Sequence, residues 1–377
     1  MNKEQMKWAQ KALDTASHKL EKVSKRSADK IPYTTVNGVH DDKSGEQIGW
    51  WTNGFWGGMM WQMYSLTGDE AYKNIAQSSE DKLDECLMNY EMLDHDNGFK
   101  WLPTAIANYQ VTKNPQSKNR GLLAAGNLAG RYNDTGNFIR AWNDRTGDDT
   151  DRRGWAIIDC MMNLPLLYWA SKETGDPRFS QIAVNHANTS MKNFIRGDGS
   201  ANHIVEFNPD SGEMVCSYGG QGYGVGSSWT RGQSWALYGF MLSYIHTGDN
   251  AYLETAERIA NYFISNIPDS GLIPVDFRQP EDVTLEDSTA AAIAACGLIE
   301  LSKRCDGRQS KVYEDAALKM LKAISDNSFN YNEDEDNLLT KCTAAYHDKN
   351  HEFSIIYGDY FYLEALMKLN SKELFIW

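Results

Sequence analysis

The chain has 377 residues and a formal net charge of -14 at pH 7, since 51 acidic residues outnumber 37 basic ones. This balance, without runs of Lys or Arg, argues against nucleic acid and anionic membrane surfaces as partners, and no apolar run is long enough to span a bilayer. No linker rich in Pro, Ser or Gly divides the chain, so we predict one domain over residues 1–377.

The six cysteines and eight histidines are dispersed along the sequence. No two of them form a close pair with the spacing of a metal site, so we expect no metal. We also expect no cofactor, and we expect the thiols to be reduced. The first residues have the pattern of an amphipathic helix rather than that of a charged and then apolar signal peptide. We therefore expect a cytoplasmic protein.

The first predicted element is a helix over residues 3–24, with apolar positions three and four residues apart. A second, almost wholly apolar helix follows the motif Trp-Trp-Thr-Asn-Gly-Phe-Trp at residues 50–56 and ends at Thr67-Gly68-Asp69. There Gly68 is expected to end one helix and Asp69 to cap the next, over residues 69–88.

The Thr-Gly-Asp signal returns at residues 174–176 and 247–249, each time after an aromatic-rich helix. An aromatic residue follows it at the same offset in all three places, as Tyr72, Phe179 and Tyr252. Such regular recurrence indicates an internal repeat of helix hairpins.

Six apolar helices are predicted to begin near residues 53, 101, 157, 231, 287 and 358, each after a more amphipathic one. The amphipathic set covers residues 3–24, 69–88, 117–131, 177–195, 249–266 and 310–326. A helix that is apolar nearly all round must be enclosed, whereas an amphipathic helix can face water. The alternation predicts an all-α toroid of six inner and six outer helices, with strand-like pieces only near residues 203–207 and 272–277.

All inner helices of such a toroid run in the same direction, so the motifs at their starts should meet on one rim. The most distinctive of these motifs is Ser227 to Phe240, which follows a glycine-rich loop and holds Trp229, Arg231, Gln233 and Trp235. Arg offers a planar fork to a carboxylate, and Trp offers a flat face to a sugar ring. The combination predicts a site for an acidic sugar.

Asp159 lies among apolar neighbours at the start of the third inner helix. Desolvation there should raise its pKa towards the range useful for proton transfer, although a plain helix cap is the alternative. Asp94 and Asp96 flank His95 on the same predicted rim, and two carboxylates at a sugar site are the usual equipment for glycosidic cleavage.

Three further polar residues have less specific patterns. Gln221 lies in the glycine run and is expected to donate to a ligand oxygen, while Asp287 and Asp359 are expected to cap the fifth and sixth inner helices. His203 has two interpretations, since a lone His can have a structural role or can reach the pocket.

Taken together, the motifs resemble those of glycoside hydrolase family 88, the unsaturated glucuronyl hydrolases, whose fold is an (α/α)6 barrel. The resemblance extends from about residue 50 to about residue 370. It rests on residues 51–56, 95–99, 157–167 (Ile-Ile-Asp-Cys-Met-Met-Asn-Leu-Pro-Leu-Leu), 229–235 (Trp-Thr-Arg-Gly-Gln-Ser-Trp), 287–290 and 358–366.

The resemblance implies that Asp159 acts as general acid and base and that Asp96 assists, although the shortened acidic loop leaves Asp94 open as the second carboxylate. It also implies that the sugar subsite is lined by Trp51, His95, Trp142, His203, Gln221, Trp229, Arg231 and Trp235. The local pattern adds Gln233 to this set. Where the family has His before the matching Gln, this chain has Gly220, which we expect to loosen contacts around the sugar.

The implied activity is removal of a terminal 4,5-unsaturated glucuronic acid from lyase-generated oligosaccharides, by hydration of the double bond. One alternative is the related unsaturated rhamnogalacturonyl hydrolase, which acts on pectin fragments. An ordinary inverting glycosidase and a non-catalytic glycan-binding protein are the other two.

Overall fold

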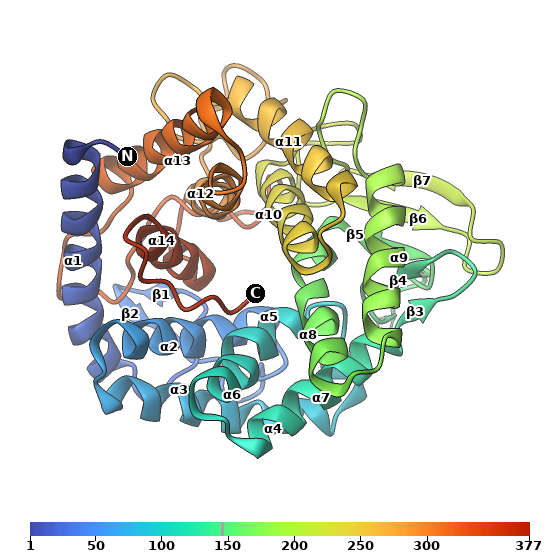
Figure 1. Ribbon diagram of the computed structural model, residues 1–377, viewed down its shortest axis with the longest axis horizontal. Coiled ribbons are helices and arrows are strands. Elements are labelled where there is room, and N and C mark those ends of the chain that lie inside the picture. Colours follow the sequence, from blue (N-terminus) through green and yellow to red (C-terminus); the bar gives the residue numbers. More distant parts are fainter. Residues whose placement is uncertain (145–146) are drawn as a thin grey trace.

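A computed structural model describes residues 1–144 and 147–377, which form a ring of helices around a central set (Figure 1). The outer helices are α1 (Lys3–Arg26), α3 (Glu70–Lys82), α7 (Pro115–Ala129), α9 (Arg178–Asn193), α11 (Asn250–Ser265) and α13 (Gly307–Asn327). The inner helices are α2 (Phe55–Thr67), α6 (Ala107–Thr112), α8 (Leu164–Thr174), α10 (Thr230–Thr247), α12 (Ser288–Ser302) and α14 (Ile356–Leu369). The predicted (α/α)6 barrel is confirmed.

Short helical turns precede several inner helices. They are α4 (Asp84–Leu87), α5 (Asn97–Trp101), and the turns η1 (Trp51–Gly54), η2 (Tyr90–Met92), η3 (Leu102–Ile106) and η4 (Ile158–Met162). The second inner helix is divided into α5, η3 and α6, and Pro103 lies at the start of η3. Proline has no amide hydrogen to donate, which explains a local change in helical hydrogen bonding.

The strands form small antiparallel sheets on the rim. They are β1 (Thr35–Val36), β2 (Val39–His40), β3 (Tyr132–Asn133), β4 (Phe138–Ile139), β5 (Trp155–Ile157), β6 (Ile204–Phe207) and β7 (Met214–Tyr218), with β6 between β5 and β7. The strand predicted near residues 203–207 is therefore confirmed as β6. The one predicted near 272–277 is wrong, because this segment forms only isolated bridges, from Pro274 to Glu286 and from Asp276 to Trp229.

The apolar inner helices account for much of the core. Every residue of 230–243, 288–301 and 356–369 is buried, as expected for helices without a polar face. The ring closes where α14, the last inner helix, packs against both α1 and α2. No helix in the two described ranges has the length and apolar content needed to cross a membrane.

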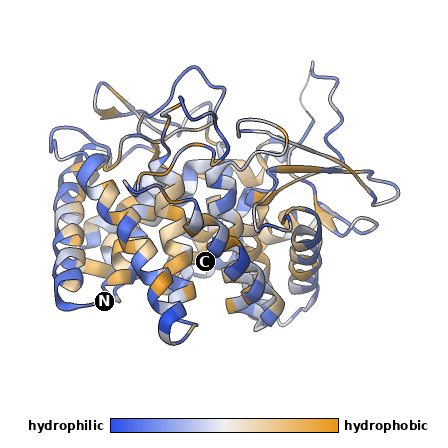
Figure 2. Ribbon diagram, turned by 90° about the horizontal axis from the view of Figure 1, so that it is seen from above, coloured by the Kyte–Doolittle hydropathy of each residue, from blue (hydrophilic) through white to orange (hydrophobic). Residues whose placement is uncertain are grey.

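The Thr-Gly-Asp repeat marks the inner-to-outer turns, as predicted. Gly68, Gly175 and Gly248 end their helices in the left-handed conformation, with φ of 75°, 73° and 73°. The following Asp carboxylate accepts a hydrogen bond from the amide two residues later in all three turns. These turns lie opposite the loops and strands, which gather on one side of the helical layer (Figure 2).

Only one of the two predicted caps is correct. The Asp287 carboxylate accepts from the amide of Thr289 and caps α12. Asp359 lies inside α14 instead, and its carboxylate accepts from the amides of Leu338 and Leu339 at 2.8 and 2.7 Å. It fastens the loop before α14 to that helix, because two backbone donors with no other partner reach it there.

Candidate active site

Asp159 and His203 face each other on the rim of the barrel. Asp159 is in η4, and its Oδ1 lies 3.7 Å from Nε2 of His203, which immediately precedes β6. Burial raises the pKa of Asp159 to about 7, against the opposing charge of Arg231. The carboxyl group therefore holds a proton up to neutral pH, as predicted from its apolar neighbours.

The imidazole of His203 is neutral, and its tautomer is fixed by the backbone. Burial, together with the charge of Arg231, lowers its pKa to about 3. The amide of Gln221 donates to Nδ1 at 3.0 Å, so the ring proton lies on Nε2, on the side of Asp159.

Gly220 permits this contact. Its φ is +57°, and a Cβ at this position would lie 1.9 Å from Nδ1 of His203. The glycine thus allows a close approach between the backbone and the imidazole. The expected effect of Gly220 on contacts around the sugar stays a prediction.

The second carboxylate beside Asp159 is that of Asp96. Its pKa lies well above the usual range because the group is buried, and the charges of Asp94 and Asp159 act in the same direction. Nδ2 of Asn163 donates to Asp96 Oδ1 at 3.4 Å and to the backbone oxygen of Asp159 at 3.2 Å. Asp94 has a different contact, since it accepts from the amide of Asp96 and closes the turn.

Asn163 was not among the predicted site residues, although it lies in a quoted motif. Besides linking the two acidic residues, its Oδ1 accepts from the amide of Phe99 at 2.8 Å. A Cβ on Gly98 would lie 2.6 Å from the Cα of Asn163, so glycine is required for this approach. Only the fold brings these two segments together, which is why no local pattern marks the contact.

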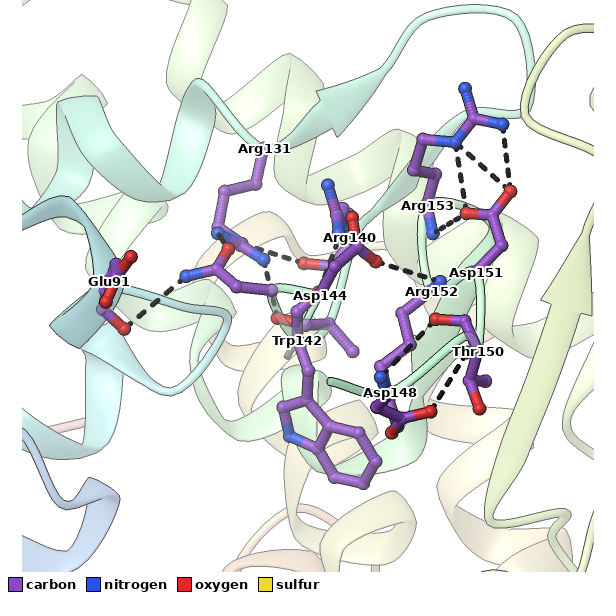
Figure 3. Close-up of polar contacts among 12 residues, drawn as sticks. Glu91, Arg131, Arg140, Trp142, Asp144, Asp148, Thr150, Asp151, Arg152 and Arg153 are labelled. Carbon is purple, nitrogen blue, oxygen red and sulfur yellow. Dashed lines mark hydrogen bonds and ion pairs between the residues drawn. The ribbon is translucent and has the colours of Figure 1, made fainter. Parts of the chain in front are cut away.

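Arg131 links the loop that carries His95 to the loop that carries Trp142. Figure 3 shows its guanidinium beside the second of these loops. The Arg131 guanidinium donates to the carbonyl oxygens of Leu93, Arg140 and Ala141 and to the side chain of Asn143. His95 is buried, its pKa is lowered to about 4 by burial, and its ring lies 6.4 Å from that of Trp142.

Trp229 and Arg231 form a stack beside His203. The guanidinium carbon of Arg231 lies 4.5 Å from the Trp229 ring centroid, and this ring lies 4.3 Å from the ring of His203. Arg231 also pairs with Asp287 at 3.1 Å. Its guanidinium also donates hydrogen bonds to the carbonyl oxygens of Thr343 and Ala344.

The side chain of Gln221 is also bound to the loop before α14. Its amide nitrogen donates to the Ala344 oxygen at 2.9 Å, and its backbone oxygen accepts from the amide of Tyr346. Gln221 and Arg231, both predicted to contact the ligand, thus share one carbonyl acceptor and hold this loop against the site.

Trp51 and Trp235 belong to a group of packed aromatic rings. Trp51 is half-buried, and its ring centroid lies 5.0 Å from that of Tyr357. Trp235 is fully buried and packs against Phe99 and Phe361 at 5.1 and 5.5 Å. Trp235 is therefore part of the packed core beneath the site and does not line an open surface. This contradicts the prediction that it lines the sugar subsite.

Gln233 faces away from this site. The side chain is fully buried, its Oε1 accepts from the amide of Ala201, and its Nε2 donates to the Gly199 oxygen. Because both ends of the amide are occupied by the backbone, Gln233 fastens residues 199–201 to α10. This contradicts the prediction that it contacts substrate.

Several buried polar atoms of the site have no protein partner within hydrogen-bond distance. They are Nδ1 of His95, Oδ1 of Asp159, Nε2 of His203, Nε1 of Trp229 and Nε of Arg231. Buried polar groups are nearly always paired, so these five atoms of the site are available to the polar groups of a ligand.

Comparison with known proteins identifies the family. The sequence profile of Glycosyl Hydrolase Family 88 matches residues 21–372. The chain belongs to this family. The protein is therefore a glycoside hydrolase, as the rim motifs predicted.

Two curated relatives are similar to this chain over most of their length. One is the unsaturated glucuronyl hydrolase of Bacillus sp. (strain GL1), which is 36% identical over 87% of this chain and 88% of its own. The other is the unsaturated chondroitin disaccharide hydrolase of Streptococcus pyogenes serotype M1, which is 36% identical over 84% of this chain and 80% of its own. A solved structure in complex with dGlcA-Glc-Rha-Glc matches with a TM-score of 0.88 and 34% identity, over 96% of both chains.

Proposed function

We propose that the enzyme removes the terminal unsaturated glucuronic acid from oligosaccharides that a polysaccharide lyase has produced, by hydrating the 4,5 double bond. The family and the names of its relatives support this activity over the rhamnogalacturonyl alternative. The observation that carries the chemistry is the desolvated carboxyl group of Asp159, whose pKa is raised to about 7, next to the second buried carboxyl group of Asp96.

Asp159 is the proposed proton donor. In the unsaturated sugar the ring oxygen and the double bond form an enol ether, so protonation of carbon 4 places positive charge on carbon 5. Water then adds to carbon 5 and gives its proton to Asp159, which returns to its starting form. The resulting hemiketal opens and releases the neighbouring sugar. A carboxyl group with a pKa of about 7 suits both transfers, because it gains and loses a proton near neutral pH.

Asp96 is proposed to assist as a neutral acid. Its raised pKa favours the protonated carboxyl group, which can donate a hydrogen bond to a sugar oxygen. A second negative charge next to Asp159 would also hinder the loss of the proton from Asp159 in the first step. Asn163 keeps the two groups in register through its contacts with both residues.

The cationic side of the proposed sugar subsite is formed by Arg231. Its Nε has no protein partner, and its charge lies close enough to Asp159 to lower the pKa of that group. We infer that this charge attracts the uronate carboxylate, while Trp51, Trp142 and Trp229 enclose the sugar ring. His95, His203 and Gln221 supply the remaining polar contacts.

The proposed compartment is the cytoplasm. All six cysteines are free thiols, namely Cys86, Cys160, Cys216, Cys296, Cys305 and Cys342. Free thiols are usual where glutathione and thioredoxin keep proteins reduced.

The activity is tested by following the ultraviolet absorbance of the double bond during incubation with unsaturated disaccharides. One panel comes from glycosaminoglycans, with and without sulfate, and the other from pectin. We expect loss of absorbance with the glucuronyl panel and release of the neighbouring sugar in equal amounts. Turnover of the pectin panel alone would favour the rhamnogalacturonyl activity, and cleavage of saturated substrates would favour an ordinary glycosidase.

A further inference from the structure

A row of three aromatic rings leads outward from the active site. The Trp142 ring, 6.4 Å from that of His95, lies 6.2 Å from the ring of Trp155, which in turn lies 5.1 Å from the ring of Tyr218. We call Trp142, Trp155 and Tyr218 the aromatic row. It is continuous, because each neighbouring pair of rings is in contact range.

The rim sheet holds the outer two members of the row in place. Trp155 begins β5 and Tyr218 ends β7, and both strands pair with β6 between them. Tyr218 also donates from its hydroxyl to the carboxylate of Glu206 on β6. A three-stranded antiparallel sheet fixes both side chains on one face, so the row is preformed.

Exposure increases along the row away from the catalytic carboxyl groups. His95 is buried, Trp142 and Trp155 are half-buried, and Tyr218 is 37% exposed. This order describes a path from the enclosed site to the surface, along which part of each ring remains accessible.

The charged side chains beside the row already have protein partners. The guanidinium carbon of Arg152 lies 5.6 Å from the Trp155 ring centroid, and Arg152 pairs with Asp148 (Figure 3). Glu206 is engaged by Tyr218. The row therefore offers flat apolar faces, which suit the C–H face of a pyranose ring, rather than an unpaired cation for a sulfate group.

We propose that the aromatic row binds the sugar units that lie beyond the first two in substrates longer than a disaccharide. This rests on the proposed function, since an enzyme that removes the terminal sugar must let the rest of the chain leave the site. The row is the continuation of that site, begins at Trp142 and ends at the surface. Its proposed occupants are pyranose units of the substrate itself, bound by stacking.

The test compares unsaturated di- and tetrasaccharides of the same glycan as substrates for wild type, Trp155→Ala and Tyr218→Ala. We expect wild type to have a lower KM for the tetrasaccharide than for the disaccharide. Each variant should raise the tetrasaccharide KM about three- to tenfold, the usual effect of losing one aromatic contact, and change disaccharide turnover less than twofold. Trp155→Phe, which keeps an aromatic face, should restore most of the tetrasaccharide affinity.

Tyr331→Ala is the matched control, because Tyr331 is a 63% exposed aromatic residue after α13, outside the row. This variant should leave KM and turnover unchanged for both the disaccharide and the tetrasaccharide. Calorimetric titration of both saccharides into Asp159→Asn repeats the comparison without turnover. Equal effects of the row variants on both lengths, or none on either, would overturn the inference even if the disaccharide is cleaved. Failure to cleave any unsaturated disaccharide would instead count against the proposed function, while the titrations still decide whether the row binds the longer chain.

Discussion

Asp159 holds its proton near neutral pH because burial outweighs the charge of Arg231. The proposed first step uses this proton, so only enzyme with protonated Asp159 can begin the reaction. We therefore expect kcat/KM to fall about tenfold per pH unit above a pKa of about 7. A pH profile of disaccharide hydrolysis, with folding checked by circular dichroism at each pH, measures this limb. A constant kcat/KM up to pH 9 would contradict the proposed donor.

Single residues also show which features of the site could be predicted from the sequence and which could not. The apolar neighbours of Asp159 are local, so its raised pKa could be predicted. Gln233 and Trp235 lie in the same distinctive stretch as Arg231, but helical geometry turns them towards other neighbours. The resemblance favoured Asp96 over Asp94 but left Asp94 open, because the contact of Asp96 with Asn163, which is distant in sequence, forms only in the fold.

Arg131 is the contact on which two active-site loops depend. Replacement by Lys keeps the positive charge but loses the planar fork that reaches three carbonyl oxygens and Asn143. We expect Arg131→Lys to lower kcat/KM for the disaccharide about tenfold, since a small displacement of catalytic groups has a large effect on rate.

Arg120→Lys is the control for this variant. Arg120 lies on α7, the helix that precedes Arg131. Its guanidinium contacts Glu80 and Asp81 on α3 and Asp84 on α4. The Arg120→Lys variant should be less stable than wild type but should keep the wild-type kcat/KM. Equal kinetic effects of the two substitutions would show that Arg131 has no specific role in the site.

Inner and outer helices should respond in opposite ways to added volume. Gly239 lies on α10, where a Cβ would be 2.4 Å from the Cβ of Met161, whereas a Cβ on Gly126 of α7 meets nothing within 4 Å. We expect Gly239→Ala to destabilise the protein by about 1–3 kcal/mol through overpacking. Gly126→Ala should stabilise it by about 0.5–1 kcal/mol, because alanine favours a helix. Urea unfolding measures both, and the same sign for the two would contradict the packing described above.

At the scale of the whole molecule, the barrel was predictable because its signals are local and repeated. The Thr-Gly-Asp turns and the helices without a polar face need no knowledge of distant contacts. The sheet of β5, β6 and β7 was largely missed, because its strands are short and β7 is mostly exposed. Its pairing depends on segments far apart in the sequence, and it is this sheet that holds Trp155 and Tyr218 in the aromatic row.

Buried histidines link the stability of the barrel to pH. The clearest case is His186 on α9, whose pKa is lowered by burial to about 3. The unfolded chain takes up this proton below pH 6.5 and the folded one does not, so its contribution to stability is present above pH 6.5 and is lost as pH falls. The difference in unfolding free energy between wild type and His186→Gln should shrink by about 2 kcal/mol from pH 7 to pH 5. Urea titrations at both values test this, and a constant difference would exclude the linkage.

The most direct measurement is single-turnover hydrolysis of an unsaturated disaccharide by wild type, Asp159→Asn and Asp94→Asn, with substrate affinity measured in parallel. Asparagine has nearly the same shape as aspartate but cannot donate a carboxyl proton. We expect Asp159→Asn to lose about a thousandfold in rate with affinity largely kept, the size of effect usual for a general acid. Asp94→Asn should stay within severalfold of wild type, because its Oδ1 can still accept from the Asp96 amide. An Asp159→Asn enzyme that hydrates the double bond within tenfold of the wild-type rate would contradict the assignment of Asp159 as the proton donor.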